Sequence, residues 1–597
     1  MKKALFIAAA MTLTSAFAAP FVYPANWSAD SAQTPQMGGT LRVTNLSDFK
    51  TLNPFISAES PNLTNLGGGL LASDAGALLT YDPAKKTYDP YMAESYTQSP
   101  DKKTFTLKIR KGMKWSDGKD ITADDWVTSA VIASDEKVGS NAYSSFYPND
   151  KQVKVSKVDD YTLKVVWPFP NVTALDFLAS FDPEPTHVFM PVYKSKGAEG
   201  IKAMWTVSTP ANQIVSWGPF QLKQYVPGER AVLEKNPYFG QWNKDSAGRA
   251  LPYLGAVNIG FVKDANASLA QFLASNTDVY QPTDRDKLAQ VKAAIDGKKI
   301  NATLVANASP VASSDFITFN MDDANSFKGK LFRNPKFRQA MSMLANRPAM
   351  VDLALGGLGQ PAYSGTYAVF TDWVAPGLDK YKYNPEQAAK LLADIGFKKG
   401  SDGILRDAKG NKLEFTLVTN AENNRRQQLA KIFADDAKKV GVQVDVSPLA
   451  FNQVVSMFDA TPGFKPRKFD AILLGLTGGS LSLPTGGVNV IPCANLPEGG
   501  NLHQFNQTNK CIFPWETQAV NLYNKAVQEF DTAKRKAISN QMQRADVENQ
   551  PYLYLESPNA HYAWTSTLHG ELPRPILSSL FASPTFGPRF ISLSYFK

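Results

Sequence analysis

Residues 90–130 of this 597-residue chain read PYMAESYTQSPDKKTFTLKIRKGMKWSDGKDITADDWVTSA, and this stretch decides the fold. Apolar and polar residues alternate over 105–109, which is the period-two pattern of a half-buried strand. Asp117 and Gly118 follow as a pair that favours a tight turn. This part of the stretch therefore predicts a strand that leads into a turn.

A helix is predicted directly after the turn. Thr122 can cap its start, and Asp125, three residues later, can reach back to the backbone of the cap as a carboxylate. Asp124 and Asp125 could also serve as paired catalytic carboxylates, but their position at a helix start favours capping. The expected apolar face of this helix consists of Trp126, Val127, Ala130 and Val131.

The literal order of these phrases resembles that of the family 5 solute-binding proteins of ABC importers, which include peptide- and nickel-binding receptors. Those proteins carry an AES-type phrase, a charged strand, then K-W-x-D-G and T-A-D-D, as residues 93–125 do here. The resemblance begins at residues 38–41, GGTL, and 51–54, TLNP, and continues through 217–220, WGPF. It covers the chain from residue 38 to about residue 597.

Strands that alternate with helices along the chain indicate α/β lobes. The resemblance implies a type II periplasmic-binding-protein fold, in which two lobes joined by a hinge are accompanied by an extra domain. Carried onto this chain, the extra domain lies at 75–210 and lobe II at 314–555. The three segments expected for the discontinuous lobe I are 38–74, 211–313 and 556–597.

The N-terminus has the pattern of a secretory signal peptide. Two lysines precede an apolar run over 4–13, and AFA at 16–18 supplies a small-residue cleavage site. We therefore expect residues 1–18 to be removed, and 19–37, rich in Pro, Ser and Ala, to form a flexible leader. The cleavage region lacks a cysteine, which predicts a protein free in the periplasm rather than a lipoprotein.

The composition is that of an ordinary globular protein, with 20% charged and 43% hydrophobic residues. The net charge of +9 falls to +7 without the two lysines of the signal peptide. This mild basic bias includes no Lys/Arg cluster of the kind that tracks phosphate backbones, so we expect no nucleic-acid partner. No stretch of about twenty apolar residues offers a membrane span.

Cys493 and Cys511 are the only cysteines, and they flank a polar stretch with little periodicity. In an oxidising compartment this arrangement predicts one disulfide that closes the loop between them, worth about 3 kcal/mol in the chain-entropy model. His503 lies between the two cysteines, so a Cys/His metal site is the alternative. Because no second pair lies nearby, we expect no metal.

Sequence motifs give catalysis little support. The four histidines are spread over the C-terminal two-thirds of the chain, and none has a metal-binding spacing such as H-E-x-x-H. Neither a G-x-S-x-G elbow nor a Walker loop occurs, and the glycine-rich 356–359 fits a turn after a helix. We therefore expect neither an enzyme nor a cofactor. A secreted hydrolase and a periplasmic holdase are the alternatives from other classes.

Two segments lie at the carboxyl ends of predicted strands, where α/β folds present ligand sites. The resemblance places them on opposite lobes, facing the cleft. The first runs from Asn45 to Asp48 and the second from Gly475 to Ser480. The chain also has 35 Phe, 22 Tyr and 10 Trp, and receptors that close over a ligand use such rings as walls. The expected ligand-binding residues are Asn45, Ser47, Asp48, Trp217, Phe316, Leu476, Thr477, Gly478, Gly479 and Ser480.

The second segment departs from the peptide receptors that it resembles. Those receptors carry G-W-x-x-D here, and the Asp pairs with the free α-amine of the ligand. This chain has Leu476 in place of the Trp and Gly479 in place of the Asp, so a buried ammonium group would lack its counter-charge. Such an uncharged wall suits backbone hydrogen bonding to a longer peptide, or a neutral ligand such as an oligosaccharide.

These features together predict a monomeric periplasmic receptor that binds an oligopeptide and delivers it to an inner-membrane ABC permease. The lobes would swing together about the hinge, exclude water and strengthen the polar contacts in the cleft. An oligosaccharide or a nickel complex is the alternative ligand within the same receptor class.

Overall fold

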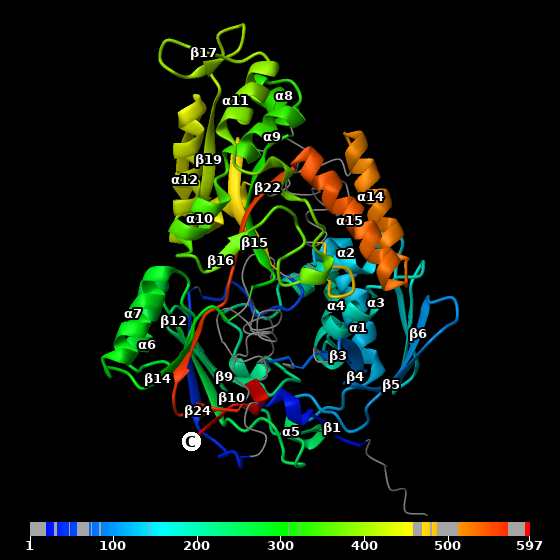
Figure 1. Ribbon diagram of the computed structural model, residues 1–597. Coiled ribbons are helices and arrows are strands. Elements are labelled where there is room, and N and C mark those ends of the chain that lie inside the picture. The colour runs from blue at the N-terminus through cyan, green and yellow to red at the C-terminus, as the bar shows by residue number, and fades with distance from the viewer. Residues whose placement is uncertain are drawn as a thin grey trace, which may run out of the picture.

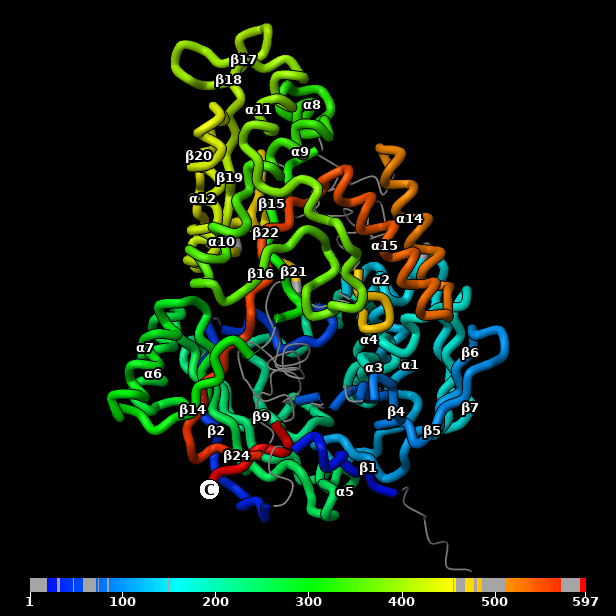
Figure 2. The backbone as a smooth tube through the Cα atoms, viewed as in Figure 1, coloured from blue at the N-terminus to red at the C-terminus, as the bar shows by residue number. Residues whose placement is uncertain are grey.

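The computed structural model shows two lobes with a third body at their side (Figure 1). Lobe II lies above lobe I in this view, and the C-terminus lies at the base of lobe I (Figure 2). The extra domain lies beside lobe I. The structure describes residues 19–28, 33–46, 48–56, 71–72, 75–82, 85–140, 142–308, 310–321, 323–457, 468–477, 480–485, 511–570 and 591–597.

Lobe I is built on a four-stranded sheet with the order β2-β12-β10-β9. β2 pairs with β12 in parallel, whereas β10 pairs with both β12 and β9 in antiparallel fashion. The sheet thereby joins the first two segments predicted for this lobe. Its strands are β2 (Thr40–Asn45), β9 (Phe220–Val226), β10 (Arg230–Lys235) and β12 (Ala256–Phe261).

A second sheet of lobe I, with the order β13-β23-β14, adds the C-terminal segment to the lobe. Two helices pack against it through apolar side chains. Asp264 and Asp284 cap these helices by accepting from backbone amides at 2.8 and 2.9 Å. The elements are α6 (Ala265–Leu273), β13 (Val279–Tyr280), α7 (Arg285–Asp296), β14 (Ala302–Val305) and β23 (Tyr562–Thr565).

The extra domain contains the predicted strand, turn and helix. The strand is β6 (Thr104–Ile109), whose alternate residues are buried, and Gly118 in the turn has a φ of 84°. Thr122 and Asp125 form the predicted capping box at the start of α1 (Ala123–Ala133). The other elements are β3 (Leu79–Asp82), β4 (Thr87–Pro90), β5 (Ala93–Gln98), α2 (Tyr143–Phe146), β7 (Lys154–Asp159), β8 (Thr162–Val166), α3 (Ala174–Ser180) and α4 (Thr186–Lys202).

The apolar face of α1 differs from the prediction at Val131, which is 40% exposed. Trp126 and Ala130 are buried as expected. Because a helix turns about 100° per residue, a face centred on these two residues continues to Ala133 and leaves Val131 at its edge. Ala133 is accordingly buried.

Lobe II is a six-stranded mixed sheet with the order β16-β22-β15-β21-β19-β20. β19 and β20 pair in parallel and are connected by a helix that packs against both. The strands are β15 (Ser313–Phe319), β16 (Gly359–Pro361), β19 (Glu414–Asn420), β20 (Gln443–Leu449), β21 (Ala471–Thr477) and β22 (Tyr552–Pro558).

Helices cover lobe II, and the one predicted from its capping signals is present. Asn384 caps it by accepting from Gln387 N at 3.0 Å, and Gly396 beyond its end has a φ of 97°. The main helices are α8 (Phe327–Arg333), α9 (Pro335–Leu344), α10 (Arg347–Ala354), α11 (Pro385–Asp394), α12 (Asn424–Val440), α14 (Pro514–Val527) and α15 (Thr532–Asn549).

The chain crosses between the lobes twice, and the two crossings lie side by side. The first leads from β14 to β15 and the second from β22 to β23, and these strands pair antiparallel on both sides of the boundary. Between the sheets, Ala308 N donates to Ala560 O at 2.8 Å. Val311 N donates to Pro558 O at 3.1 Å. The hinge is therefore a two-stranded ribbon, about which the lobes can rotate as bodies.

The N-terminal segment is packed onto the rest of the protein, which corrects the expected flexible leader over 19–37. β1 (Phe21–Val22) pairs in parallel with β11 (Asn243–Lys244). Tyr23 and Trp27 are buried, and their rings meet edge to face with centroids 5.5 Å apart. The Pro, Ser and Ala content predicted flexibility, but large aromatic side chains bury enough apolar area to order this segment.

We expect Trp27→Ala to lower the thermal-unfolding midpoint, because Trp27 is only 3% exposed. Truncation of a buried aromatic side chain typically costs about 3–5 kcal/mol. Scanning calorimetry measures the change, and Val22→Ala is the matched control because Val22 is 48% exposed. If both variants unfolded at the wild-type temperature, the segment would not belong to the cooperative core.

Candidate functional site

A cavity of about 410 Å³ lies where the hinge enters lobe II. It is lined by Ser314 on β15, by Ser557 on β22 and by the loop over 362–379. Tyr363 and Tyr367 contribute aromatic rings from that loop. Among the described residues that line the cavity, Asp379 alone carries a charge at neutral pH. Its volume and lining suit a largely uncharged ligand.

The loop over 362–379 also contacts the segment that follows β21. Thr366 Oγ1 donates to Pro484 O at 3.0 Å. Pro484 belongs to the described residues 480–485, which begin with the predicted site residue Ser480. The cavity and this end of the predicted ligand wall therefore belong to one region of lobe II.

Two buried carboxyl groups and two partly exposed arginines meet at the same end of the lobe II sheet. Asp315 on β15 lies opposite Glu556 on β22 in the sheet register, and both are fully buried. Arg425 and Arg426, in the first turn of α12, donate to Asp315 at 2.8 and 3.0 Å. Arg425 Nε also lies 3.4 Å from Glu556 Oε1. This charge cluster joins α12 to both hinge strands.

The two carboxyl groups of the charge cluster have opposite pKa shifts. Burial opposes the ionisation of Asp315, but the charges of Arg425 and Arg426 outweigh it and lower the pKa of Asp315. Burial raises the pKa of Glu556, Arg425 opposes the rise, and the nearby Asp315 carboxylate adds to it. A hydrogen bond between the two carboxyl groups also raises the pKa of Glu556 and lowers that of Asp315. Because the two groups interact, a proton held by the pair resides on Glu556 rather than on Asp315.

Gly475 on β21 fits against the charge cluster because it has no side chain. A Cβ at this position would lie 2.2 Å from Asp315 Oδ1 and 2.6 Å from Arg426 Nη2. The glycine at the start of the second predicted segment is therefore needed for packing.

Lobe I reaches this end of lobe II through the start of α7. A Cβ on Gly356 would lie 2.6 Å from Cδ of Arg285, so the two lobes are in contact here. Gly356 and Gly357 have φ values of 62° and 78°, and they form the turn that was predicted after the helix now seen as α10.

The predicted site residues of lobe I that the structure describes are buried in lobe I or contact its own turns. Asn45 is buried at the end of β2. Asp48 accepts from the Tyr225 hydroxyl at 2.8 Å and from Gly228 N at 2.5 Å, so it fixes the β9–β10 turn. Trp217 is 4% exposed within the hydrophobic core, and its place in the ligand wall stays a prediction. Ser47 lies outside the described residues.

In lobe II, Phe316 is also packed within an apolar cluster. It is 1% exposed, and its ring meets that of Tyr552 edge to face at 5.1 Å. Every residue of β15 is buried, because both faces of this central strand are covered. Leu476 packs half-buried against the same apolar cluster, and Thr477 ends β21.

Ser480 is a predicted site residue that connects two parts of the protein. Its hydroxyl donates to Asp176 of the extra domain at 2.8 Å. Gly478 and Gly479 lie outside the described residues. Cys511 carries a disulfide bond, while its predicted partner Cys493 lies outside the described residues. The Cys493–Cys511 pairing therefore stays a prediction.

The charge cluster and Asp176 were not found from the sequence. A signal for the cluster existed, since Arg425 and Arg426 occupy the first turn of a helix, where cations are unfavourable unless an anion holds them. Asp315 within an apolar strand was a second signal. Asp176 has no comparable signal, because its partners in lobe II are about 300 positions away in the chain.

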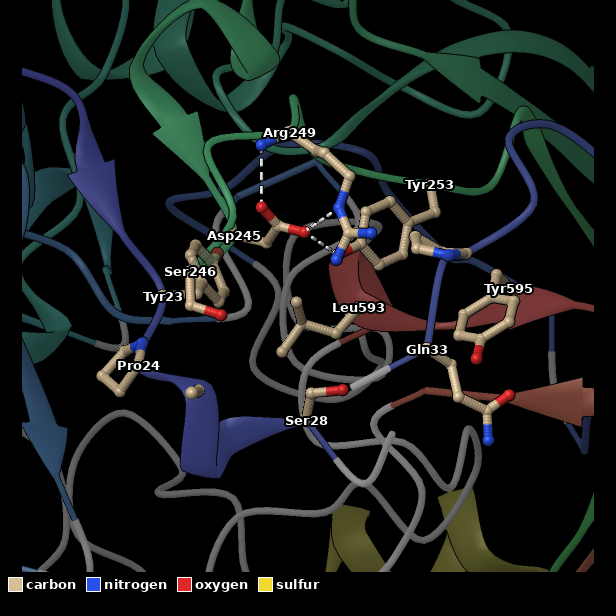
Figure 3. Close-up of a pocket in the computed structure, with 12 residues that line it drawn as sticks. Tyr23, Pro24, Ser28, Gln33, Asp245, Ser246, Arg249, Tyr253, Leu593 and Tyr595 are labelled. Carbon is tan, nitrogen blue, oxygen red and sulfur yellow. Dashed lines mark hydrogen bonds and ion pairs between the residues drawn. The ribbon is translucent and has the colours of Figure 1, made fainter. Parts of the chain in front are cut away.

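A second, much smaller cavity, of about 10 Å³, lies in lobe I where both ends of the chain meet (Figure 3). Asp245 accepts from Arg249 Nε at 2.5 Å and from the Tyr253 hydroxyl at 2.6 Å. Tyr23 and Tyr595 line the cavity from the two ends of the chain. The carboxylate and the guanidinium thus neutralise each other, and the arrangement ties the termini to lobe I.

A two-lobed α/β protein with a ribbon hinge and an extra domain has the architecture of a solute receptor. The model of "Bacterial extracellular solute-binding proteins, family 5 Middle" matches residues 87–490. The chain belongs to this family. The predicted family and the predicted type II binding-protein fold are therefore confirmed.

Relatives and solved structures agree with this membership. The chain is 60% identical over the full length of both proteins to a probable ABC transporter-binding protein of Deinococcus radiodurans. It is 27% identical to the oligopeptide-binding protein AppA of Bacillus subtilis over 90% of each chain. The structure of AppA with a nonapeptide matches with a TM-score of 0.72 and 24% identity, covering 94% of this chain and all of that chain.

The solved structure of a sugar-bound receptor is about as similar to this chain as that of AppA. The binding protein MelB of Agrobacterium fabrum, in complex with stachyose, matches with a TM-score of 0.75 and 21% identity. The match covers 97% of this chain and 87% of that chain.

As a family 5 member, the chain is the substrate-binding component of an ABC transporter. Its ligand is a small solute, and its partner is a membrane permease. The family acts outside the cytoplasm. Within the ranges that the structure describes, no helix is both long and apolar enough to cross a membrane.

We expect Glu556→Gln to change how stability depends on pH. The folded-state pKa of Glu556 is raised from its ordinary 4.5 to about 8, so its contribution to stability is present below pH 4.5 and is lost as the pH rises through 8. A glutamine side chain at this position cannot ionise, so the variant should lose less stability than the wild type between pH 5 and 9.

Thermal-unfolding midpoints measured across this pH range test the expectation. Each kcal/mol should shift a midpoint by roughly 2–4 °C for a body of 150–250 residues. Glu199→Gln is the control, because the Glu199 side chain is 83% exposed. Parallel curves for Glu556→Gln and the wild type would contradict a raised pKa.

Proposed function

We propose that this protein is a periplasmic receptor that binds oligopeptides between its lobes, closes about the ribbon hinge and hands the ligand to its permease. We choose a peptide as the ligand because the chain is similar to the oligopeptide-binding protein AppA over 90% of both chains. The cavity beside the hinge supports it, because an extended peptide is held chiefly by neutral backbone hydrogen bonds. The receptor acts as a monomer and catalyses no reaction.

Oligosaccharide is the second candidate ligand, and two observations favour it. Gly479 stands where the peptide receptors that this chain resembles carry the Asp that binds the ligand's amine. The cavity presents hydroxyl groups and the rings of Tyr363 and Tyr367, which suit the hydroxyls and flat faces of sugars.

Calorimetric titration separates the two candidates. Peptides of two to ten residues should bind, and acetylation of their α-amine should change affinity less than tenfold, because no buried ion pair is lost. Oligosaccharides of similar size form the comparison series. Binding of sugars without any peptide would overturn the peptide proposal, and a larger loss on acetylation would reveal another acidic anchor for the amine.

We expect Gly479→Asp to weaken the binding of neutral ligands. The new carboxylate would be desolvated in the closed cleft without a partner, at a cost of roughly 1–3 kcal/mol or more. Gly479→Asn is the matched control, since it adds the same volume without the charge. Equal affinities for the two variants would place residue 479 away from the bound ligand.

The proposal includes export through a signal peptide. We expect the mature protein to begin at about Ala19, because AFA at 16–18 satisfies the small-residue rule for cleavage. Intact-mass analysis of the protein from the periplasm measures this. A retained Met1, or a mass increase equal to a lipid, would contradict a free periplasmic receptor.

A further inference from the structure

Asp176, on α3 of the extra domain, accepts hydrogen bonds from its own domain and from lobe II. Within the extra domain, the Tyr88 hydroxyl donates to its Oδ1. From lobe II, Ser480 Oγ donates to Oδ2 at 2.8 Å. The backbone amides of Leu481 and Ser482 donate to Oδ1 at 3.1 and 3.4 Å. One carboxylate of the extra domain thus receives three hydrogen bonds from a short segment of lobe II.

The segment over 480–483 is shaped to make these contacts. Ser480 Oγ donates to Asp176 and also accepts from Leu483 N at 3.0 Å, so it folds its own turn. The turn directs consecutive backbone amides toward one carboxylate. Hydrogen bonds to a charged acceptor are stronger than those between neutral groups.

Apolar contacts also join the extra domain to lobe II near the Asp176 carboxylate. Phe169 of the extra domain packs against an apolar cluster of lobe II that includes Leu483 and Val527. Val172 N donates to Val527 O at 2.7 Å. Water is displaced from these surfaces when they meet, which strengthens the nearby polar contacts.

These contacts can exist only while the extra domain and lobe II touch. The hinge ribbon connects lobe II to lobe I, not to the extra domain. Rotation of lobe II about the ribbon would therefore separate Asp176 from the 480–482 segment and leave both to water.

We propose that Asp176 is the latch of this receptor: it holds the 480–482 segment of lobe II against the extra domain when the lobes are closed. Asp176 is a positioning residue, because it holds the 480–482 segment in place. The predicted ligand wall ends in this segment, at Ser480. The inference rests on the hinge closure proposed above, and it does not depend on whether the ligand is a peptide or a sugar.

Small-angle X-ray scattering tests the latch on the full mature protein, refolded from denaturant with no ligand added. We expect Asp176→Asn to have a larger radius of gyration than the wild type, since a neutral amide holds the three donors less well. Ser480→Ala should shift the radius in the same direction by a smaller amount. Asp124→Asn is the control, because Asp124 lies in the same domain but pairs on the surface with Lys157.

Hydrogen exchange gives a second readout that simple destabilisation would not reproduce. In Asp176→Asn, peptides that contain Leu481 and Ser482 should exchange at least tenfold faster, while those from β21 keep their wild-type rate. Equal radii for Asp176→Asn and the wild type, or equal exchange over 480–485, would overturn the latch. Because neither measurement uses a ligand, a failure of the peptide proposal is distinguishable from a failure of the latch.

Discussion

The antiparallel ribbon between the lobes is the constraint on which the rest of the structure depends. Each of its strands continues into a sheet on both sides, so the two lobes are joined only by the short stretches of ribbon between those sheets. There, Asn307 N donates to Nδ1 of His561 at 2.8 Å. Burial lowers the pKa of His561 to about 4, so the ring stays neutral and keeps accepting this hydrogen bond at neutral pH.

The charge cluster ties the hinge strands of lobe II to its helical layer. Asp315 and Glu556 lie on the two hinge strands, and Arg425 and Arg426 connect them to α12. Burying ions is costly unless each is paired, and removing one partner of such a cluster leaves an uncompensated charge. The first residues of lobe II beyond the hinge are therefore fixed to its helical layer.

Local patterns predicted local structure well, and long-range contacts poorly. The capping box of Thr122 and Asp125 and the start of α11 at Asn384 were readable, because their partners lie within four residues in the sequence. Family resemblance supplied the lobes and the hinge. The predicted site residues have different surroundings: Ser480 of lobe II contacts Asp176 of the extra domain, whereas Phe316 is buried in the core. Asp176 and the charge cluster depend on residues more than a hundred positions apart, which single-sequence patterns do not encode.

The loop over 362–379 belongs both to the cavity and to the contact with the extra domain. It lines the cavity together with Ser314 and Ser557. Its Trp373 packs in the same apolar cluster as Phe169 of the extra domain, and its Asp372 Oδ2 lies 3.9 Å from Lys86 Nζ of that domain. If the cavity holds the ligand, as proposed above, the ligand and the surface that meets the extra domain are connected through this one loop.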